Sequence, residues 1–219
     1  MSATSFRART AAIAAATAAA LALSTSAWAV PDAQFLPLFE QFEVINNGDT
    51  SKLEKVSEGF AALLKSEPTN PVLMAYTGTT TAMKSNTTML PWKKMSYAED
   101  GMAMLDKAIA MLTPEHDKPI QHDTPGSLEV KLLAAKTFLN VPGFMNKGPR
   151  GAKLVGELTS SPLLANSPVG FQGVVWMTAG ELAVTEKRAA DARKHFNKVI
   201  ELKAPQADAA RAQLAKLAP

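Results

Sequence analysis

The residues best suited to binding a metal ion lie in one short loop, Pro114 to Asp123, which reads PEHDKPIQHD and contains the pair His-Asp twice. The pairs are His116-Asp117 and His122-Asp123. Imidazole and carboxylate groups are common ligands of Zn²⁺, so the loop is a candidate metal site. No further His or Cys stands nearby, and the prolines stiffen the loop without arranging a tetrahedron. A solvated loop is the favoured interpretation, and metal binding stays as the alternative.

Methionine is a second candidate ligand, because its thioether binds Cu(I). The methionines crowd the part of the chain formed by Met74, Met83, Met89, Met95, Met102, Met104 and Met111. They lack the dense, regular clustering of a dedicated copper site. Methionine also fills gaps in cores and adapts to partners at surfaces, and that interpretation is favoured here.

Motifs of catalysis are missing from the chain. The sequence contains no G-x-S-x-G, no H-E-x-x-H, no phosphate-binding glycine loop and no dinucleotide fingerprint. The chain has three histidines and no cysteine, so few side chains are available to act as a nucleophile and its general base. We therefore expect neither an enzyme nor a cofactor.

Two segments combine aromatic and Met side chains with Lys or Arg. One spans about residues 85–96 and contains most of MLPWKKMSY (residues 89–97), and the other, VPGFMNKGPRG, spans residues 141–151. Aromatic, Met and Arg side chains are enriched at the cores of protein interfaces. The predicted partner-binding residues are Trp92, Lys93, Met95, Phe144, Met145 and Lys147. The alternative is that Trp92 and Phe144 fold back into the core.

The first residues predict secretion. Arg7 and Arg9 precede an apolar run from Thr10 to Leu23, and Ala27 and Ala29 form an A-x-A cleavage pattern. The run is shorter than the ~20 residues with which a helix spans a bilayer. We expect residues 1–29 to be a cleaved signal peptide, residues 30–219 to be one domain, and the location to be periplasmic, without membrane insertion after cleavage.

The composition narrows the classes of partner. The 23 Lys and Arg residues exceed the 20 Asp and Glu residues only slightly, and two of the basic residues belong to the predicted signal peptide. A nearly neutral chain has no electrostatic attraction for nucleic acid or for an anionic membrane surface. The absence of cysteine excludes disulfides and a lipid anchor on a cysteine.

The elements that must position these residues are helices. Apolar residues from Leu53 to Leu64 recur at helical spacing with charged residues on the other face, and 98–112 shows a similar stripe. We expect no helix across the segment MLPWKKMSY, because Pro91 interrupts it. Residues 205–218 are predicted to form a last, capping helix.

Near the C-terminus the spacing resembles the tetratricopeptide repeat (TPR), W-x2-L-G-x2-Y followed by A-x3-F and proline over about 34 residues. The matching positions are Trp176, Ala179, Gly180, Ala183, Ala192, Phe196 and, one place late, Pro205. Ala179 and Ala183 depart from the expected Leu and Tyr. Phe60, Pro68 and Gly78 fit the same register earlier in the chain.

The chain thus resembles degenerate TPR-like proteins of the bacterial cell envelope. The resemblance implies an all-α fold, a solenoid of about four antiparallel helix pairs with a C-terminal capping helix. It also implies an interaction scaffold or adaptor that binds a protein or peptide, for example within an envelope transport or assembly system. An irregular helical bundle is the alternative fold. A small-ligand or metal-binding module, using the Met-rich region or the His-Asp loop, is the alternative function.

Overall fold

The computed structural model describes residues 30–120 and 122–217, and the predicted signal peptide lies outside the described residues. Within these ranges the chain is helical and forms no β-strand, which confirms the all-α prediction. The only β-type pairing among the described residues is an isolated bridge between Pro119 and Pro125.

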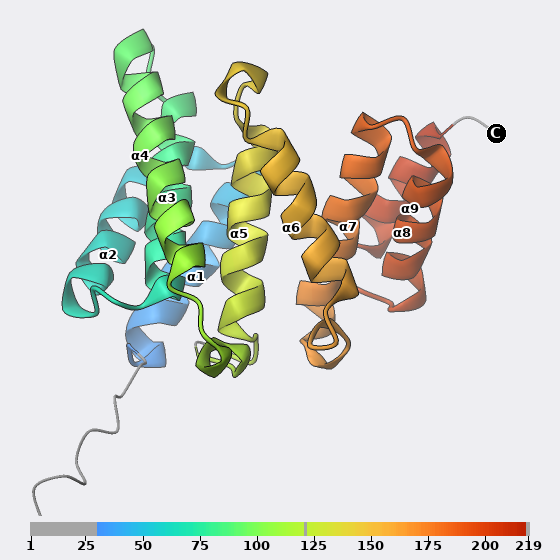
Figure 1. Cartoon of the computed structure of the whole chain (residues 1–219), viewed down its shortest axis with the longest axis horizontal. Coiled ribbons are helices and arrows are strands. Elements are labelled where there is room, and N and C mark those ends of the chain that lie inside the picture. Colours follow the sequence, from blue (N-terminus) through green and yellow to red (C-terminus); the bar gives the residue numbers. More distant parts are fainter. Residues whose placement is uncertain (1–29, 121, 218–219) are drawn as a thin grey trace, which may run out of the picture.

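Consecutive helices run in alternating directions, and each packs against the next (Figure 1). The α-helices are α1 (Asp32–Asn46), α2 (Leu53–Ser66), α3 (Pro71–Met83), α4 (Pro91–Ala110), α5 (Gly126–Asn140), α6 (Gly148–Ser160), α7 (Val169–Thr185), α8 (Ala189–Glu201) and α9 (Ala207–Lys216). Short 3-10 helices are η1 (Thr50–Lys52), η2 (Lys84–Asn86), η3 (Pro114–Asp117), η4 (Gly143–Met145) and η5 (Leu164–Asn166). In addition, α3 packs against α5, which places the two candidate segments in neighbouring parts of the fold.

Helix α4 begins earlier than the sequence pattern suggests. Pro91 is its first residue and Leu90, which precedes it, is extended, so Trp92, Lys93 and Met95 lie on the first turns of a helix. The expectation that MLPWKKMSY is non-helical is therefore wrong. Proline breaks a helix in its interior but suits its first position, where no backbone N–H is needed and φ is already helical.

Two glycines bring α3 and α4 close together. A Cβ atom placed on Gly101 would lie 2.5 Å from the carbonyl oxygen of Gly78 and 2.6 Å from the backbone nitrogen of Ala82. A Cβ on Gly78 would lie 2.8 Å from the carbonyl oxygen of Gly101. Only residues without a side chain permit this backbone approach, which fixes the α3–α4 pair that carries the first candidate segment.

An aromatic cluster holds α1, α2 and α3 together. The ring of Tyr76 lies 4.7 Å from that of Phe60, 5.0 Å from that of Phe42 and 5.4 Å from that of Phe35, measured between centroids. All four side chains are buried. Offset and edge-on packing of this kind adds stability beyond the burial of apolar area.

The C-terminal helices have a small core of their own, which continues the main core through Trp176. Its centre is Phe196 of α8, which lies where the absent side chain of Gly180 would be on α7. A Cβ on Gly180 would come within 2.4 Å of the Phe196 ring. The glycine and phenylalanine spaced as in a TPR thus make a real helix-to-helix contact.

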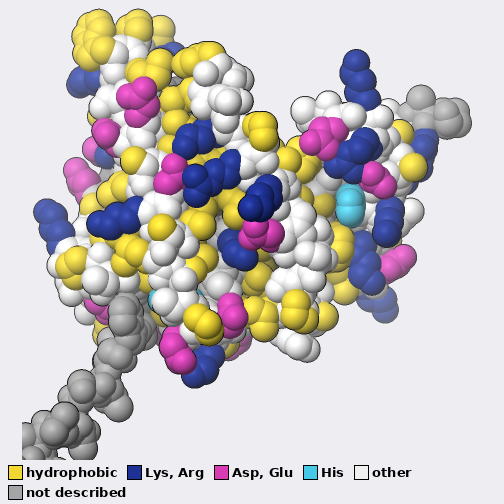
Figure 2. Space-filling view, viewed as in Figure 1, with side chains coloured by type: hydrophobic (Ala, Val, Ile, Leu, Met, Phe, Trp, Pro, Cys, Tyr) yellow, Lys and Arg dark blue, Asp and Glu magenta, His cyan; other side chains and the backbone are white. Residues whose placement is uncertain are grey.

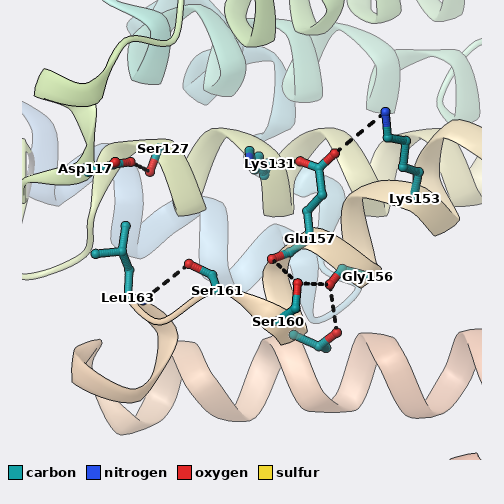
Figure 3. A network of polar contacts seen from close by, with 10 residues as sticks. Asp117, Ser127, Lys131, Lys153, Gly156, Glu157, Ser160, Ser161 and Leu163 are labelled. Atoms are coloured by element: carbon teal, nitrogen blue, oxygen red, sulfur yellow. Dashed lines mark hydrogen bonds and ion pairs between the residues drawn. The ribbon is translucent and has the colours of Figure 1, made fainter.

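Polar contacts join α5 and α6 outside the core (Figure 3). Glu157 of α6 pairs with Lys131 of α5 at 2.9 Å. At the start of α5, the hydroxyl of Ser127 donates to Asp117 of η3. The first contact links α5 to α6, whose connection carries the second candidate segment, and the second links α5 to η3.

Candidate binding surface

The side chains on and just before the first turns of α4 are largely exposed. Trp92 is 67% exposed and Met89 is 89% exposed, and Leu90 and Met95 are also exposed. Figure 2 shows hydrophobic side chains gathered at this tip of the molecule. Burial resumes at Ala98, from which α4 packs on α3. Trp92 therefore does not fold back into the core, and that alternative is excluded for this residue.

The connection between α5 and α6 is the second exposed segment. It contains η4 and turns at Asn146, whose φ of 52° is left-handed. Phe144 is 73% exposed, whereas Met145 is partly buried against the core. Figure 1 shows this connection and the start of α4 at the same end of the fold. Phe144, like Trp92, does not fold back into the core.

The two segments border one cavity of about 630 Å³, which we call the apolar cavity. Its lining residues are Phe42, Asn46, Thr79, Ala82, Met83, Ser85, Asn86, Pro91, Lys94, Met95, Ala98, Leu133, Lys136, Thr137, Asn140, Val141, Pro142, Phe144 and Met145. Of the predicted site residues, Met95, Phe144 and Met145 line it. The charged lining side chains are Lys94 and Lys136, and no described carboxylate lines the cavity. The cavity is therefore apolar with a positive charge.

Lys147, one of the predicted partner-binding residues, forms contacts within the fold. Its ammonium nitrogen lies 2.8 Å from a carboxylate oxygen of Asp106 and 5.4 Å from the centre of the Phe138 ring. Arg150 pairs with the other oxygen of Asp106 at 2.9 Å and also lies over Phe138. The charge of Lys147 is thus used within the α4–α5–α6 contact, whereas Lys93 remains exposed on α4.

The His-Asp loop does not gather its four candidate ligands. His116 accepts the backbone N–H of Thr113 at 2.9 Å, Asp117 accepts from Ser127, and His122 faces Glu129. Asp123 is exposed. Residues 30–120 and 122–217 hold no group of three or more His, Asp or Glu side chains placed to bind a metal ion. The metal alternative is therefore not taken further.

A buried carboxylate, Glu129 of α5, is a candidate that the sequence analysis missed. Its Oε1 accepts hydrogen bonds from the hydroxyl of Tyr76 and from Nε2 of His122, the latter at 3.0 Å. Glu129 is only 3% exposed. The signal in the sequence is a single acid between Leu128 and Val130 on an otherwise apolar helix stretch.

This cluster alters the protonation of its members. Burial raises the pKa of Tyr76 well above its ordinary value, and the charge of Glu129 raises it further. Burial acts to lower the pKa of His122, but the hydrogen bond and charge of Glu129, with Asp123 and Asp32, outweigh it and raise that pKa. The protonated form of His122 is thus favoured in the folded chain. His122 also has a left-handed φ of 42°.

Comparison with protein-family models, with curated proteins and with solved structures gave no match to this chain. In the described part of the chain, no helix is both long enough and apolar enough to cross a bilayer. The functional argument therefore depends on the geometry of the site.

Proposed function

We propose that the chain is an interaction scaffold that binds a segment of a partner protein in the apolar cavity. The partner segment carries an apolar anchor, which enters between Met95 and Phe144, and acidic residues, which face Lys94 and Lys136. Exposed Met and aromatic side chains suit such an anchor because they adapt their shape and bury a large apolar area. The observation that carries the proposal is this cavity, which is lined by Met95, by exposed Phe144 and by two lysines without a carboxylate. Exposed Trp92 lies on the same first turns of α4 as the lining residues Pro91 and Met95.

The proposed architecture is a TPR-like solenoid in which α1–α2, α3–α4, α5–α6 and α7–α8 form four pairs and α9 closes the array. The sequential packing of the helices supports it, as does the contact of Gly180 with Phe196. In such an array, each pair buries its apolar face only by stacking on its neighbours. Helix ends and the connections at one edge are then left exposed for a partner.

The proposed location is the periplasm, where the protein would act as an adaptor. Support comes from the basic start, the short apolar run and the A-x-A pattern that ends at Ala29. Edman sequencing of the protein recovered from a periplasmic extract is expected to begin near Val30. Recovery of the full-length chain in the cytoplasmic fraction alone would contradict this location.

Selection of peptides from a random phage-displayed library tests the binding proposal. Enriched peptides are expected to combine an aromatic or large aliphatic residue with Asp or Glu, and to bind with measurable affinity by fluorescence anisotropy. Truncating a hot-spot side chain typically costs about 2 kcal/mol or more. The double variant Trp92→Ala/Phe144→Ala should therefore bind at least about thirtyfold more weakly.

The matched control is Val169→Ala/Val184→Ala, which removes two other exposed apolar side chains, both on α7. It is expected to bind the selected peptides as the wild type does. Lys94→Glu should weaken binding and make the remaining affinity less sensitive to salt. Equal affinity of the wild type and the Trp92→Ala/Phe144→Ala variant, or enrichment of basic peptides, would refute the proposal.

A small amphiphile with a carboxylate is the second candidate, favoured by the volume of the cavity. Small-molecule sites commonly enclose about 300–1,000 Å³ and are lined mainly by apolar side chains. Displacement of a bound peptide by dodecanoate, but not by dodecanol, would favour this candidate. It predicts little effect of Trp92→Ala, because Trp92 is not one of the lining residues.

A further inference from the structure

A second cavity, of about 790 Å³, has the opposite charge and is not used by the proposed function. We call it the acidic cavity. Its lining residues are Phe39, Phe42, Glu43, Asn46, Asn47, Tyr76, His122, Asp123, Thr124, Glu129, Leu132, Leu133, Lys136, Pro168, Gly170, Phe171, Val174, Met177, Thr178, Glu181, Pro205 and Gln206. Four of them carry carboxylates, whereas Lys136 and His122 are the basic ones. The excess of carboxylates makes this cavity attractive to a cation.

Glu129 supplies a second, independent indication of a ligand. Its Oε1 is used by Tyr76 and His122, whereas its Oε2 is shielded from solvent and has no hydrogen-bond partner among the described residues. A buried carboxylate oxygen without a donor is unfavourable, and native proteins rarely leave one in that state. Glu129 forms part of the cavity wall, so the proposed ligand brings an N–H donor that Oε2 accepts once the Glu129 carboxylate turns toward the cavity.

Aromatic rings provide the rest of the recognition. Phe39 and Phe171 line the cavity, and the ring of Phe39 lies 4.8 Å from that of His122. The faces of aromatic rings attract cations, and their apolar area accommodates an alkyl stem. Glu181, on the α7 side of the cavity, has a pKa raised by burial and partly lowered by Lys136. A bound cation would favour its ionised form.

We propose that the acidic cavity binds a primary ammonium group on an apolar stem, with Glu129 as the central acceptor and Glu43 and Glu181 as flanking charges. The same chemistry is offered by a free alkylamine and by the side chain of a lysine in a peptide. This proposal does not depend on the partner of the apolar cavity. The ammonium ligand of the acidic cavity is positively charged, whereas the partner segment proposed for the apolar cavity is acidic.

Isothermal titration with hexylammonium chloride tests the proposal, with hexan-1-ol and sodium hexanoate as probes of the same length. Hexylammonium is expected to bind at least about tenfold more tightly than either, because only it can pair with a carboxylate. Glu129→Gln keeps the shape and one acceptor oxygen but removes the charge, and should weaken binding about tenfold. The control Glu115→Gln alters an exposed acid that pairs only with Lys118, and should leave binding unchanged.

Circular dichroism establishes whether each variant is folded. If Glu129→Gln does not fold, Glu43→Gln and Glu181→Gln carry the test, because neither residue belongs to the buried core and each variant should still weaken binding about threefold. Tighter binding of an acetyl-lysyl-amide peptide than of hexylammonium would assign the site to a peptide side chain, and the reverse would assign it to a free amine. Equal affinities for hexylammonium and hexan-1-ol, or unchanged affinity in the folded carboxylate variants, would overturn the proposal.

Discussion

Replacing Gly101 by Ala should destabilise the chain, although alanine is the better helix former. Gly101 lies inside α4, and a Cβ there would be 2.5 Å from the Gly78 oxygen, 2.6 Å from the Ala82 nitrogen and 2.7 Å from the Ala82 Cβ. Two of these atoms belong to the backbone of α3, so no side-chain rotation relieves the overlap. The α3–α4 pair must separate to accommodate the methyl group.

Two opposing effects determine the size of this change. Overpacking a well-packed contact costs about 1–3 kcal/mol, and the involvement of backbone atoms places this site at the upper end. Removing a helical glycine returns about 1 kcal/mol. The expected net loss in the free energy of unfolding is therefore about 1–2 kcal/mol.

The control is the same substitution at Gly156, an exposed position inside α6 where a Cβ would meet nothing within 4 Å. Gly156→Ala should raise the free energy of unfolding by up to about 1 kcal/mol. Urea unfolding of both variants measures the two changes, and each kcal/mol should move the melting temperature by about 2–4 °C. A Gly101→Ala protein as stable as the wild type, beside a stabilised Gly156→Ala protein, would show that α3 and α4 do not approach this closely.

Three further outcomes follow from the same contacts. The stabilising effect of His122, measured as the difference in melting temperature from His122→Gln, should be larger at about pH 5.5 than at about pH 8.5. Because its pKa is raised on folding, the effect is complete below the unfolded value of 6.5 and is lost as the pH rises through the folded value. Asp106→Ala should lower stability by about 1 kcal/mol in urea unfolding, because it leaves two cations over Phe138 without their carboxylate. Trp92→Ala should change the free energy of unfolding by less than about 0.5 kcal/mol, because this exposed side chain supports no core contact.

The sequence pattern predicts the helices well where apolar periodicity and breakers agree. Asn70 and Pro71 illustrate this, because the Asn70 side chain accepts from the backbone N–H of Val72 at 3.0 Å and Pro71 occupies the first helical position. The start of α4 has the same proline but no capping side chain. Helical periodicity in MLPWKKMSY is weak because most of its side chains are exposed, so a pattern of buried positions cannot reveal these turns.

The local sequence likewise reveals some features of the candidate site and not others. The sequence leaves open whether Trp92 and Phe144 are exposed or fold back into the core, and the structure shows both of them exposed. The pairing of Lys147 with Asp106 joins residues far apart in the chain, so local sequence cannot reveal it. The contact between Tyr76 and Glu129 likewise depends on the packing of α3 against α5. Tertiary packing, which composition and spacing do not encode locally, determines both.

Lys136 connects the two cavities physically. It lines both of them, together with Phe42, Asn46 and Leu133, and its charge acts on Glu181 in the acidic cavity. Apart from Lys136 and His122, the charged lining groups are separated by sign, because Lys94 lines the apolar cavity and the carboxylates, such as Glu129, line the acidic cavity. Lys136 therefore attracts a ligand with acidic groups in the apolar cavity and repels a ligand with an ammonium group in the acidic cavity. The separation of charge across one wall, more than the volume of either cavity, is what gives this fold two distinguishable binding surfaces.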